Sequence, residues 1–139
     1  MRGKTRSVVL LACALCALAL TALVATTAFA KSSHNVNMLG HGGQNGIKLH
    51  ATYKGSPFGT CKMTGTLVIP NTQQTWKCGN KGSFKLVGHG TTGAANDAKG
   101  TWKIVRGSGK GKYKGISGKG TFAGKLSTGI FRYKGTAKY

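Results

Sequence analysis

The chain has 139 residues, of which 21 are Lys or Arg and only one, Asp97, is acidic, so its formal net charge is +20. Paired carboxylates for glycoside cleavage, oxygen-rich Ca²⁺ or Mg²⁺ sites and a carboxylate-oriented catalytic His all need acids that a single Asp cannot supply. The composition therefore excludes most enzyme mechanisms, and we predict no catalytic residue.

The first 30 residues have the pattern of a secretory signal peptide. Basic residues at positions 2, 4 and 6 precede an apolar run from Val8 to Val24, which contains Cys13 and Cys16, and Ala28-Phe29-Ala30 is an A-x-A cleavage site. An uncleaved membrane anchor is the alternative, because the run is just long enough to span a bilayer. The cleavage site favours a secreted bacterial protein with no transmembrane segment after signal cleavage.

Cleavage after Ala30 leaves 109 residues, the size of one domain. This part keeps 18 of the Lys and Arg residues together with Asp97, so its net charge is +17. It also keeps two cysteines, Cys61 and Cys78, with 16 residues between them. An even pair in an exported chain predicts a disulfide, here a structural one because no C-x-x-C motif follows the signal.

Residues 31–45 show no hydrophobic period and are rich in Ser, Asn and Gly, so we expect a flexible lead-in before a barrel domain at 46–139. Strict alternation follows. In the last segment Phe131, Tyr133 and Ala137 alternate with basic or polar residues, which is typical of a half-buried antiparallel strand. Strands are expected near residues 47–54, 60–69, 73–78, 82–89, 100–106, 112–117, 120–126 and 130–138.

The remaining composition also favours strands. The 22 glycines after the signal disfavour helices, and glycine within strands suits bulges and the sharp curvature of a closed sheet. A polar loop is expected over 90–98, and it contains Asp97. The predicted fold class is all-β, a single antiparallel β-barrel of about eight strands preceded by a cleaved signal peptide. Its core is expected to consist largely of aromatic residues: Tyr53, Phe84, Trp102, Tyr113, Phe122, Phe131 and Tyr133.

One segment, 109–124, has the form G-x-Y-x-G-x-x-G-x-G-T-aromatic from Gly111 to Phe122, and a closing strand with aromatic residues follows it. Over roughly 99–139 the chain resembles small secreted bacterial barrels related to the allene oxide cyclase and dirigent group. The resemblance implies an eight-stranded antiparallel barrel with an apolar cavity. The cyclases use a buried acid, which only Asp97 could provide, so no catalytic residue carries over.

The four histidines, His34, His41, His50 and His89, are too scattered to predict a metal site, which needs three or four converging ligands. Two of them fall in the expected lead-in. We predict no metal and no cofactor. His89, between two glycines, is the titratable group whose burial is worth testing.

The outward face of nearly every expected strand carries lysine. Such a surface attracts polyanions without selecting a sequence, and the scarcity of Arg argues against base-specific reading of nucleic acid. The leading hypothesis is a non-enzymatic protein that binds polyanions or anionic envelope surfaces. The alternatives are a carrier of a small apolar ligand, a cyclase-like isomerase, a structural or competition factor, or charge that only aids solubility. The sequence does not predict the oligomeric state. The expected diffuse polyanion surface comprises Lys103, Arg106, Lys110, Lys112, Lys114, Lys119, Arg132, Lys134 and Lys138.

Overall fold

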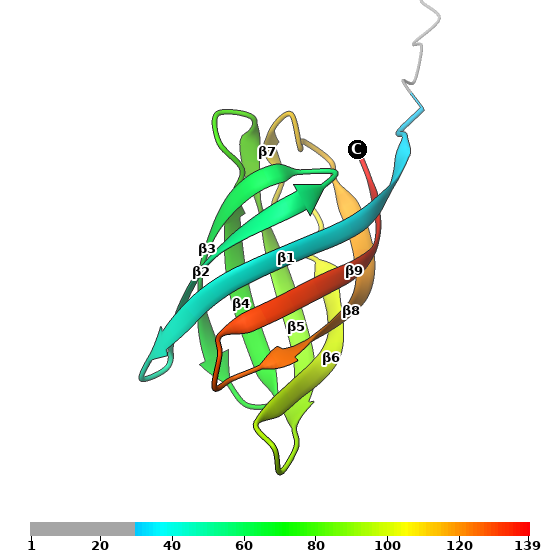
Figure 1. The fold of residues 1–139 in the computed structure, drawn as a ribbon. Helices are drawn as coiled ribbons and strands as arrows, with labels where there is room; N and C mark the ends of the chain where they lie inside the picture. Colours follow the sequence, from blue (N-terminus) through cyan, green and yellow to red (C-terminus); the bar gives the residue numbers. More distant parts are fainter. Residues whose placement is uncertain (1–29) are drawn as a thin grey trace, which may run out of the picture. The chain divides into compact units, whose positions relative to one another are not determined.

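A computed structural model describes residues 30–139, which contain nine β-strands and no α-helix (Figure 1). The predicted signal peptide, with Cys13 and Cys16, lies outside the described residues apart from Ala30. Within the described part, no helix has the length and apolar character needed to cross a membrane. The strands are β1 (Ser33–Asn45), β2 (Lys48–Ser56), β3 (Gly59–Val68), β4 (Asn71–Lys77), β5 (Gly82–Thr92), β6 (Asp97–Ile104), β7 (Lys110–Gly111), β8 (Ser117–Lys125) and β9 (Ile130–Lys138).

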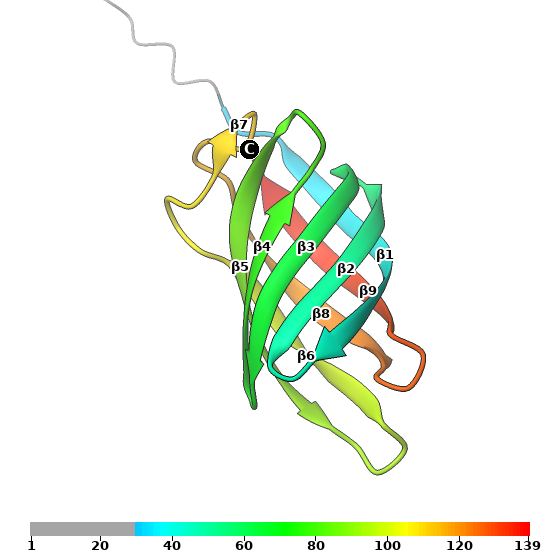
Figure 2. The same cartoon turned by 90° about the vertical axis from the view of Figure 1, so that its left-hand side faces the viewer.

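Eight of these strands form a closed antiparallel barrel. The order around the sheet is β4-β3-β2-β1-β9-β8-β6-β5, and pairing of β4 with β5 closes the circle (Figures 1 and 2). The two-residue β7 pairs only with the start of β5, at Gly82 and Ser83, whereas β6 pairs with β5 from Leu86 onward. The all-β, eight-stranded antiparallel barrel predicted from alternation is therefore confirmed. Closure leaves no long unpaired strand edge, which would otherwise invite aggregation.

The expected flexible lead-in at 31–45 is wrong, because all of it from Ser33 onward forms β1, which pairs with both β2 and β9. Val36 and Met38 are buried and alternate with exposed polar residues. Gly40 continues the inward face where a side chain cannot fit: a Cβ there would lie 2.2 Å from the ring of Tyr53. The barrel domain thus begins at β1, and the compact unit spans Lys31–Tyr139.

Two other expectations also need correction. The strand expected near 112–117 is absent; after β7 the chain makes consecutive turns, with backbone hydrogen bonds from Lys114 N to Gly111 O (3.1 Å) and from Ile116 N to Tyr113 O (2.9 Å). The polar loop expected over 90–98 is shorter, since β5 continues to Thr92 and β6 begins at Asp97. Polarity on an outward strand face is indistinguishable from loop polarity in such a short segment.

The two ends of the barrel differ. At one end, here called the closed end, lie the β2–β3 and β4–β5 turns and the 105–116 connection. That connection places Tyr113 and Ile116, both at most 2 % exposed, over the barrel interior. Tyr113 makes edge-on contacts with Phe58 and Phe84, with ring centroids 5.6 and 5.5 Å apart. Aromatic packing therefore fills this half of the interior.

Trp102 shows how inward glycines accommodate large rings. Its indole lies against Gly120 and Gly135, where added Cβ atoms would come within 2.7 and 2.8 Å of Cζ2. The indole Nε1–H donates to the carbonyls of Thr121 and Lys134, each at 3.1 Å. Of the aromatic core predicted from the sequence, every member is buried except Phe131, which is partly buried against the core.

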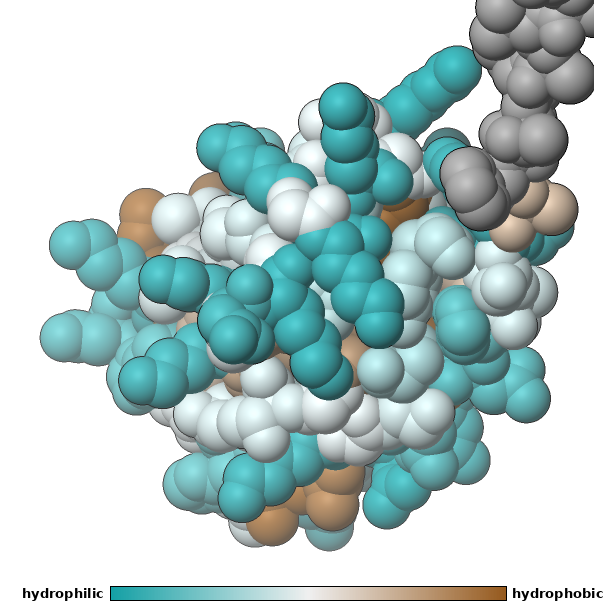
Figure 3. Space-filling model, turned by 90° about the horizontal axis from the view of Figure 1, so that it is seen from above, coloured by the Kyte–Doolittle hydropathy of each residue, from teal (hydrophilic) through white to brown (hydrophobic). Residues whose placement is uncertain are grey.

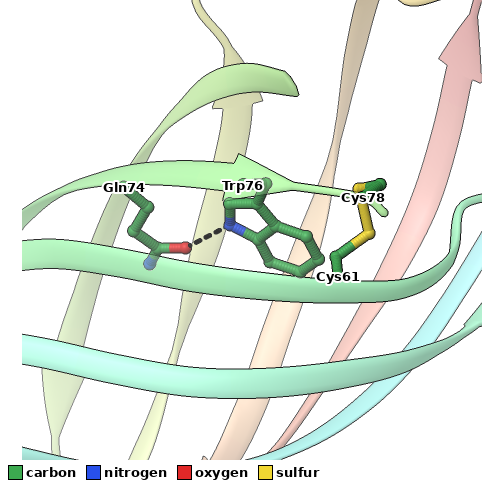
Figure 4. The surroundings of a disulfide bond; sticks show 4 residues. All are labelled: Cys61, Gln74, Trp76 and Cys78. Atoms are coloured by element: carbon green, nitrogen blue, oxygen red, sulfur yellow. Dashed lines mark hydrogen bonds between the residues drawn. A yellow bond between two sulfur atoms is a disulfide. The ribbon is translucent and has the colours of Figure 1, made fainter. Parts of the chain in front are cut away.

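The disulfide between Cys61 and Cys78 is present, as predicted. Cys61 lies in β3 and Cys78 directly follows β4, one position beyond the paired residues Lys62 and Lys77. Figure 4 shows the bond beside Trp76, with Gln74 on the other side of the indole. Both sulfur-bearing residues are buried, so the bond joins two neighbouring strands inside the closed half.

Candidate functional site: an apolar cavity at the open end of the barrel

The opposite end of the barrel, here called the open end, contains a cavity of about 330 Å³. This end is formed by the β1–β2, β3–β4, β5–β6 and β8–β9 turns, which lie together in both ribbon views (Figures 1 and 2). Leu67 N, near the end of β3, donates a backbone hydrogen bond to Ile47 O in the β1–β2 turn (2.8 Å), and Leu126 N in the β8–β9 turn donates to Asn96 O in the β5–β6 turn (2.9 Å). The mouth therefore consists of short turns that are bonded to neighbouring strand ends or turns.

Most of the cavity wall is apolar, and every barrel strand contributes to it. Glycine occupies inward positions beside the cavity, at Gly42 on β1 and Gly90 on β5, so these positions add no side chain to it. At Gly90 and Gly100, a Cβ would lie 2.7 and 2.8 Å from the ring of Phe122. The apolar lining comprises Leu49, Ala51, Met63, Leu67, Ile69, Pro70, Ala98, Phe122, Leu126 and Phe131.

A cluster of neutral polar side chains lies at the cavity's inner boundary. The amide Nε2 of Gln74, on β4, donates to the hydroxyl of Tyr133 at 2.9 Å and to Thr72 Oγ1 at 3.1 Å. Gln74 Oε1 accepts the indole N–H of Trp76 at 2.9 Å, the bond drawn in Figure 4. The ring of Tyr53 stacks on Trp76, with centroids 4.5 Å apart. Gln74 is thus fixed by partners on two strands.

The phenols of this cluster stay protonated at neutral pH. Burial raises the pKa of Tyr53, and the neighbouring Tyr133 raises it further. Burial likewise raises the pKa of Tyr133, opposed in part by its hydrogen bonds with Gln74 and Tyr53. A neutral hydroxyl both donates and accepts hydrogen bonds. Thr72, Tyr53 and Tyr133 therefore present to the cavity uncharged hydroxyl groups that can donate or accept a hydrogen bond.

No Lys, Arg, Asp or Glu is among the residues that line the cavity. An ionised ligand group at its inner end would lose hydration without an opposite charge to compensate, which is costly. The arrangement can therefore hold an uncharged, mostly apolar molecule and orient one polar group. The one titratable imidazole in the lining, His50, is exposed, and the inner boundary is formed by the neutral groups of Gln74 and Tyr133.

Asp97 is not part of this site. It is exposed at the first position of β6, in register with Lys125, and does not line the cavity. The histidines do not converge either: within residues 30–139 no three metal-binding side chains gather at one point. His89 is exposed and its Nδ1 lies 3.0 Å from Asn71 Oδ1, whereas His50 lies at the cavity mouth.

All nine residues predicted as a polyanion surface are exposed. The structure does not gather them into one site. Arg106, Lys110, Lys112 and Lys114 lie on the closed-end connection, whose face in Figure 3 shows many projecting hydrophilic side chains. The others follow the outer faces of strands at several levels: Lys103, Lys119, Arg132, Lys134 and Lys138.

Gln74 was not identified from the sequence, although it is the central polar residue of the site. The signal is present in the alternation of β4, where Thr72, Gln74 and Trp76 face inward and Gln73 and Thr75 face outward. A glutamine at an inward position, two residues before a tryptophan, indicates a buried hydrogen-bonding site. The alternation alone does not show that Tyr133, 59 residues away, is its partner.

The comparisons with known proteins cover only part of the barrel. A family model described as a protein of unknown function (DUF3224) matches residues 66–133. The matched range runs from β3 into β9 and includes both Gln74 and Tyr133. No curated protein matches the chain. Over just under half of its length, the chain is similar to this family of unknown function.

Proposed function

We propose that this protein is a non-enzymatic carrier of a small, uncharged, mainly apolar molecule, which it binds in the open-end cavity. The observation that carries the proposal is the cavity of about 330 Å³, apolar along its walls and ending at the Gln74–Tyr133 hydrogen-bond cluster. Concave apolar sites with a few convergent polar groups are the usual form of small-molecule sites.

The size of the cavity limits the ligand. An apolar protein cavity of about 150 Å³ holds benzene, so a volume of about 330 Å³ suits a molecule with two fused rings or a chain of similar bulk. The neutral hydroxyls at the inner boundary favour one alcohol, ketone or amide group on that molecule. A carboxylate or an ammonium group is disfavoured at the inner boundary, because the groups there, Gln74 and Tyr133, carry no charge to pair with it.

Three naphthalene derivatives test this proposal, with binding followed by quenching of tryptophan fluorescence. We expect naphthol to bind more tightly than naphthalene, and naphthoate to bind most weakly. In Tyr133→Phe the preference for naphthol over naphthalene should shrink, because the hydroxyl that meets the polar group is gone. Equal affinity for naphthoate and naphthol would contradict the uncharged-ligand proposal.

A matched pair of variants tests the location. Leu49→Trp fills the cavity from β2 and should weaken naphthol binding about tenfold or more, which corresponds to about 1.4 kcal/mol. Leu39→Trp makes the same change on the outward face of β1, where Leu39 is 45 % exposed, and should leave affinity unchanged. If both variants bind naphthol as the unaltered protein does, the ligand site is elsewhere.

The structure favours a carrier over the isomerase that the family resemblance implies. The cyclase mechanism requires a buried acid, and the sole acid of this chain, Asp97, is exposed and outside the cavity lining. Asp97→Asn should therefore leave naphthol binding unaltered. A loss of binding in that variant would return Asp97 to the site.

Polyanion binding is a second candidate function, supported by one specific observation. Lys62 lies directly opposite Lys77, and Lys103 directly opposite Lys119, on the barrel exterior. Like charges directly opposite each other on paired strands destabilise a sheet. A bound polyanion would relieve this repulsion. The lysine pairs therefore favour an anionic partner over the alternative that the charge serves only solubility.

Export is also part of the proposal, since it accounts for the signal-like N-terminus and for the disulfide. Mass spectrometry of protein recovered from the culture medium should give a chain beginning at Lys31. Its mass should be lower by two hydrogens than that of the reduced chain, owing to the Cys61–Cys78 bond. Protein retained in the cells with its first 30 residues intact would contradict export.

A further inference from the structure

The open end carries an unusual concentration of exposed apolar side chains. Eight large hydrophobic residues are exposed among residues 30–139, and five of them lie at the turns of this end. We call these five the apolar rim. They are Ile47 (60 % exposed), Val68 (65 %), Ile69 (66 %), Leu126 (41 %) and Ile130 (46 %).

The rim is continuous with the cavity. Ile69 and Leu126 are exposed to solvent and also line the cavity mouth. Ile47 lies beside the β3–β4 turn, because its carbonyl accepts a hydrogen bond from Leu67 N. Two sides of the mouth, the β3–β4 turn and the β8–β9 turn, therefore present hydrophobic side chains both inward and outward.

Basic residues adjoin the rim. Lys48 follows Ile47, and Lys125 precedes Leu126. The only acid of the chain, Asp97, is in register with Lys125, so no further negative charge opposes the bases at this end. Exposed apolar side chains bordered by lysine match the chemistry of a bilayer with anionic headgroups, where apolar groups enter the acyl boundary and lysines meet the phosphates.

We propose that the open end docks on an anionic lipid bilayer, with the apolar rim in the acyl boundary. Resting on the proposed carrier function, docking would let an apolar ligand pass between bilayer and cavity without crossing water. A second copy of the chain is a poorer occupant of the rim. Two copies would bring together the lysines of both open ends in molecules that carry a net charge of +17 each beyond residue 30.

Sedimentation with lipid vesicles tests docking, with residues 31–139 as the protein sample. This part of the chain contains all nine described strands and the disulfide. The probes are vesicles of phosphatidylcholine alone and of phosphatidylcholine with phosphatidylglycerol. Val68→Ser combined with Ile69→Ser should lower binding to the anionic vesicles about tenfold or more. Val87→Ser is the matched control, because Val87 is 41 % exposed on the outer face of β5 and should not matter.

A charge pair separates the two ends of the molecule. Lys48→Gln with Lys125→Gln should weaken binding to the anionic vesicles and leave the weaker binding to neutral vesicles unchanged. Lys103→Gln with Lys119→Gln, on the barrel side toward the closed end, should have a smaller effect. If the second pair weakens binding as much as the first, or if the rim variant binds as the unaltered protein does, open-end docking is wrong.

Two further readouts keep the proposals distinct. If size-exclusion chromatography shows a dimer that the rim variant dissociates, and vesicles do not bind, the rim is a self-association surface and docking is refuted. Naphthol affinity without vesicles should be the same in Val87→Ser and in the unaltered protein. Naphthol binding without vesicle binding would refute docking and support the carrier; vesicle binding without naphthol binding would support docking and refute ligand transfer.

Discussion

At the scale of single residues, Gln74 has the most consequential environment. It is 4 % exposed, and apart from tyrosine and tryptophan it is the only polar side chain in the buried core of residues 30–139. Its amide provides partners for the Trp76 indole and the Tyr133 hydroxyl. Because both partners are buried, the amide satisfies groups that would otherwise lose hydrogen bonds on folding.

We predict that Gln74→Leu lowers the free energy of unfolding by about 1–3 kcal/mol, because the Trp76 N–H loses its acceptor and the Tyr133 hydroxyl its donor. Urea unfolding followed by tryptophan fluorescence measures the change. Gln73→Leu is the matched control, since Gln73 is the exposed neighbour on the same strand and its substitution should be near neutral. Equal effects of the two changes would mean that the buried hydrogen bonds do not contribute to stability.

The tyrosines predict how stability depends on alkaline pH. Burial raises the pKa of all four tyrosines of the chain above the usual 10.0: Tyr53, Tyr113, Tyr133 and Tyr139. The folded state keeps protons that the unfolded state releases near pH 10.0. Stability is therefore complete below that pH and falls as the pH rises through and above it.

Urea unfolding at about pH 8 and about pH 11 should show this loss, and Tyr53→Phe should reduce the difference between the two values. Tyrosinate absorbance gives a second measure, since the folded protein should ionise later than an unfolded sample. Ionisation of all tyrosines near their ordinary pKa, with the barrel still folded, would contradict the burial described here.

At the scale of elements, the disulfide acts on the pairing of β3 with β4. Cys61 and Cys78 close a loop with 16 residues between them, and cross-linking such a loop reduces the entropy of the unfolded chain. We predict that reduction lowers the free energy of unfolding by about 3 kcal/mol. Urea unfolding with and without a reducing agent measures this.

The variant with both Cys61→Ala and Cys78→Ala serves as the control, because its stability should not respond to the reducing agent. The reduced protein should still fold, since the barrel closes through eight strand pairs and the bond links only β3 with the end of β4. A reduced protein as stable as the oxidised one would show that the bond does not constrain the unfolded chain.

At the scale of the whole molecule, the lysine pairs on the exterior predict a salt-dependent interaction with polyanions. Binding to double-stranded DNA of random sequence, used as a probe, should weaken log-linearly as the salt concentration rises. Lys103→Gln with Lys119→Gln should reduce the slope of log K against log salt by up to about 2. Lys48→Gln with Lys125→Gln, at the open end, is the matched control and should change the slope less. A slope that is flat in the unaltered protein would exclude polyanion binding.

The sequence alone was sufficient for the fold class and for the disulfide. Alternation of period two, as at Phe131, Tyr133 and Ala137, reports which face of a strand is buried, and this property is local. It failed at β1 because glycine takes inward positions there: Gly40 faces the ring of Tyr53, and a residue without a side chain carries no hydrophobic signal. It failed at 112–117 because buried Tyr113 and Ile116 belong to turns that cover the closed end.

Only the tertiary structure decided where the barrel is filled and where it is hollow. That distinction depends on which inward residues meet across the barrel, such as Gln74 with Tyr133, 59 residues apart, and Gly90 with Phe122. The tertiary structure also showed that the rim residues Ile47, Ile69 and Leu126, which come from three separate turns, lie at the same open end of the barrel. Composition and the alternation of hydrophobic residues are properties of neighbours along the chain. A cavity and its rim depend instead on the order and register of the strands, which are established only when the sheet closes into a barrel.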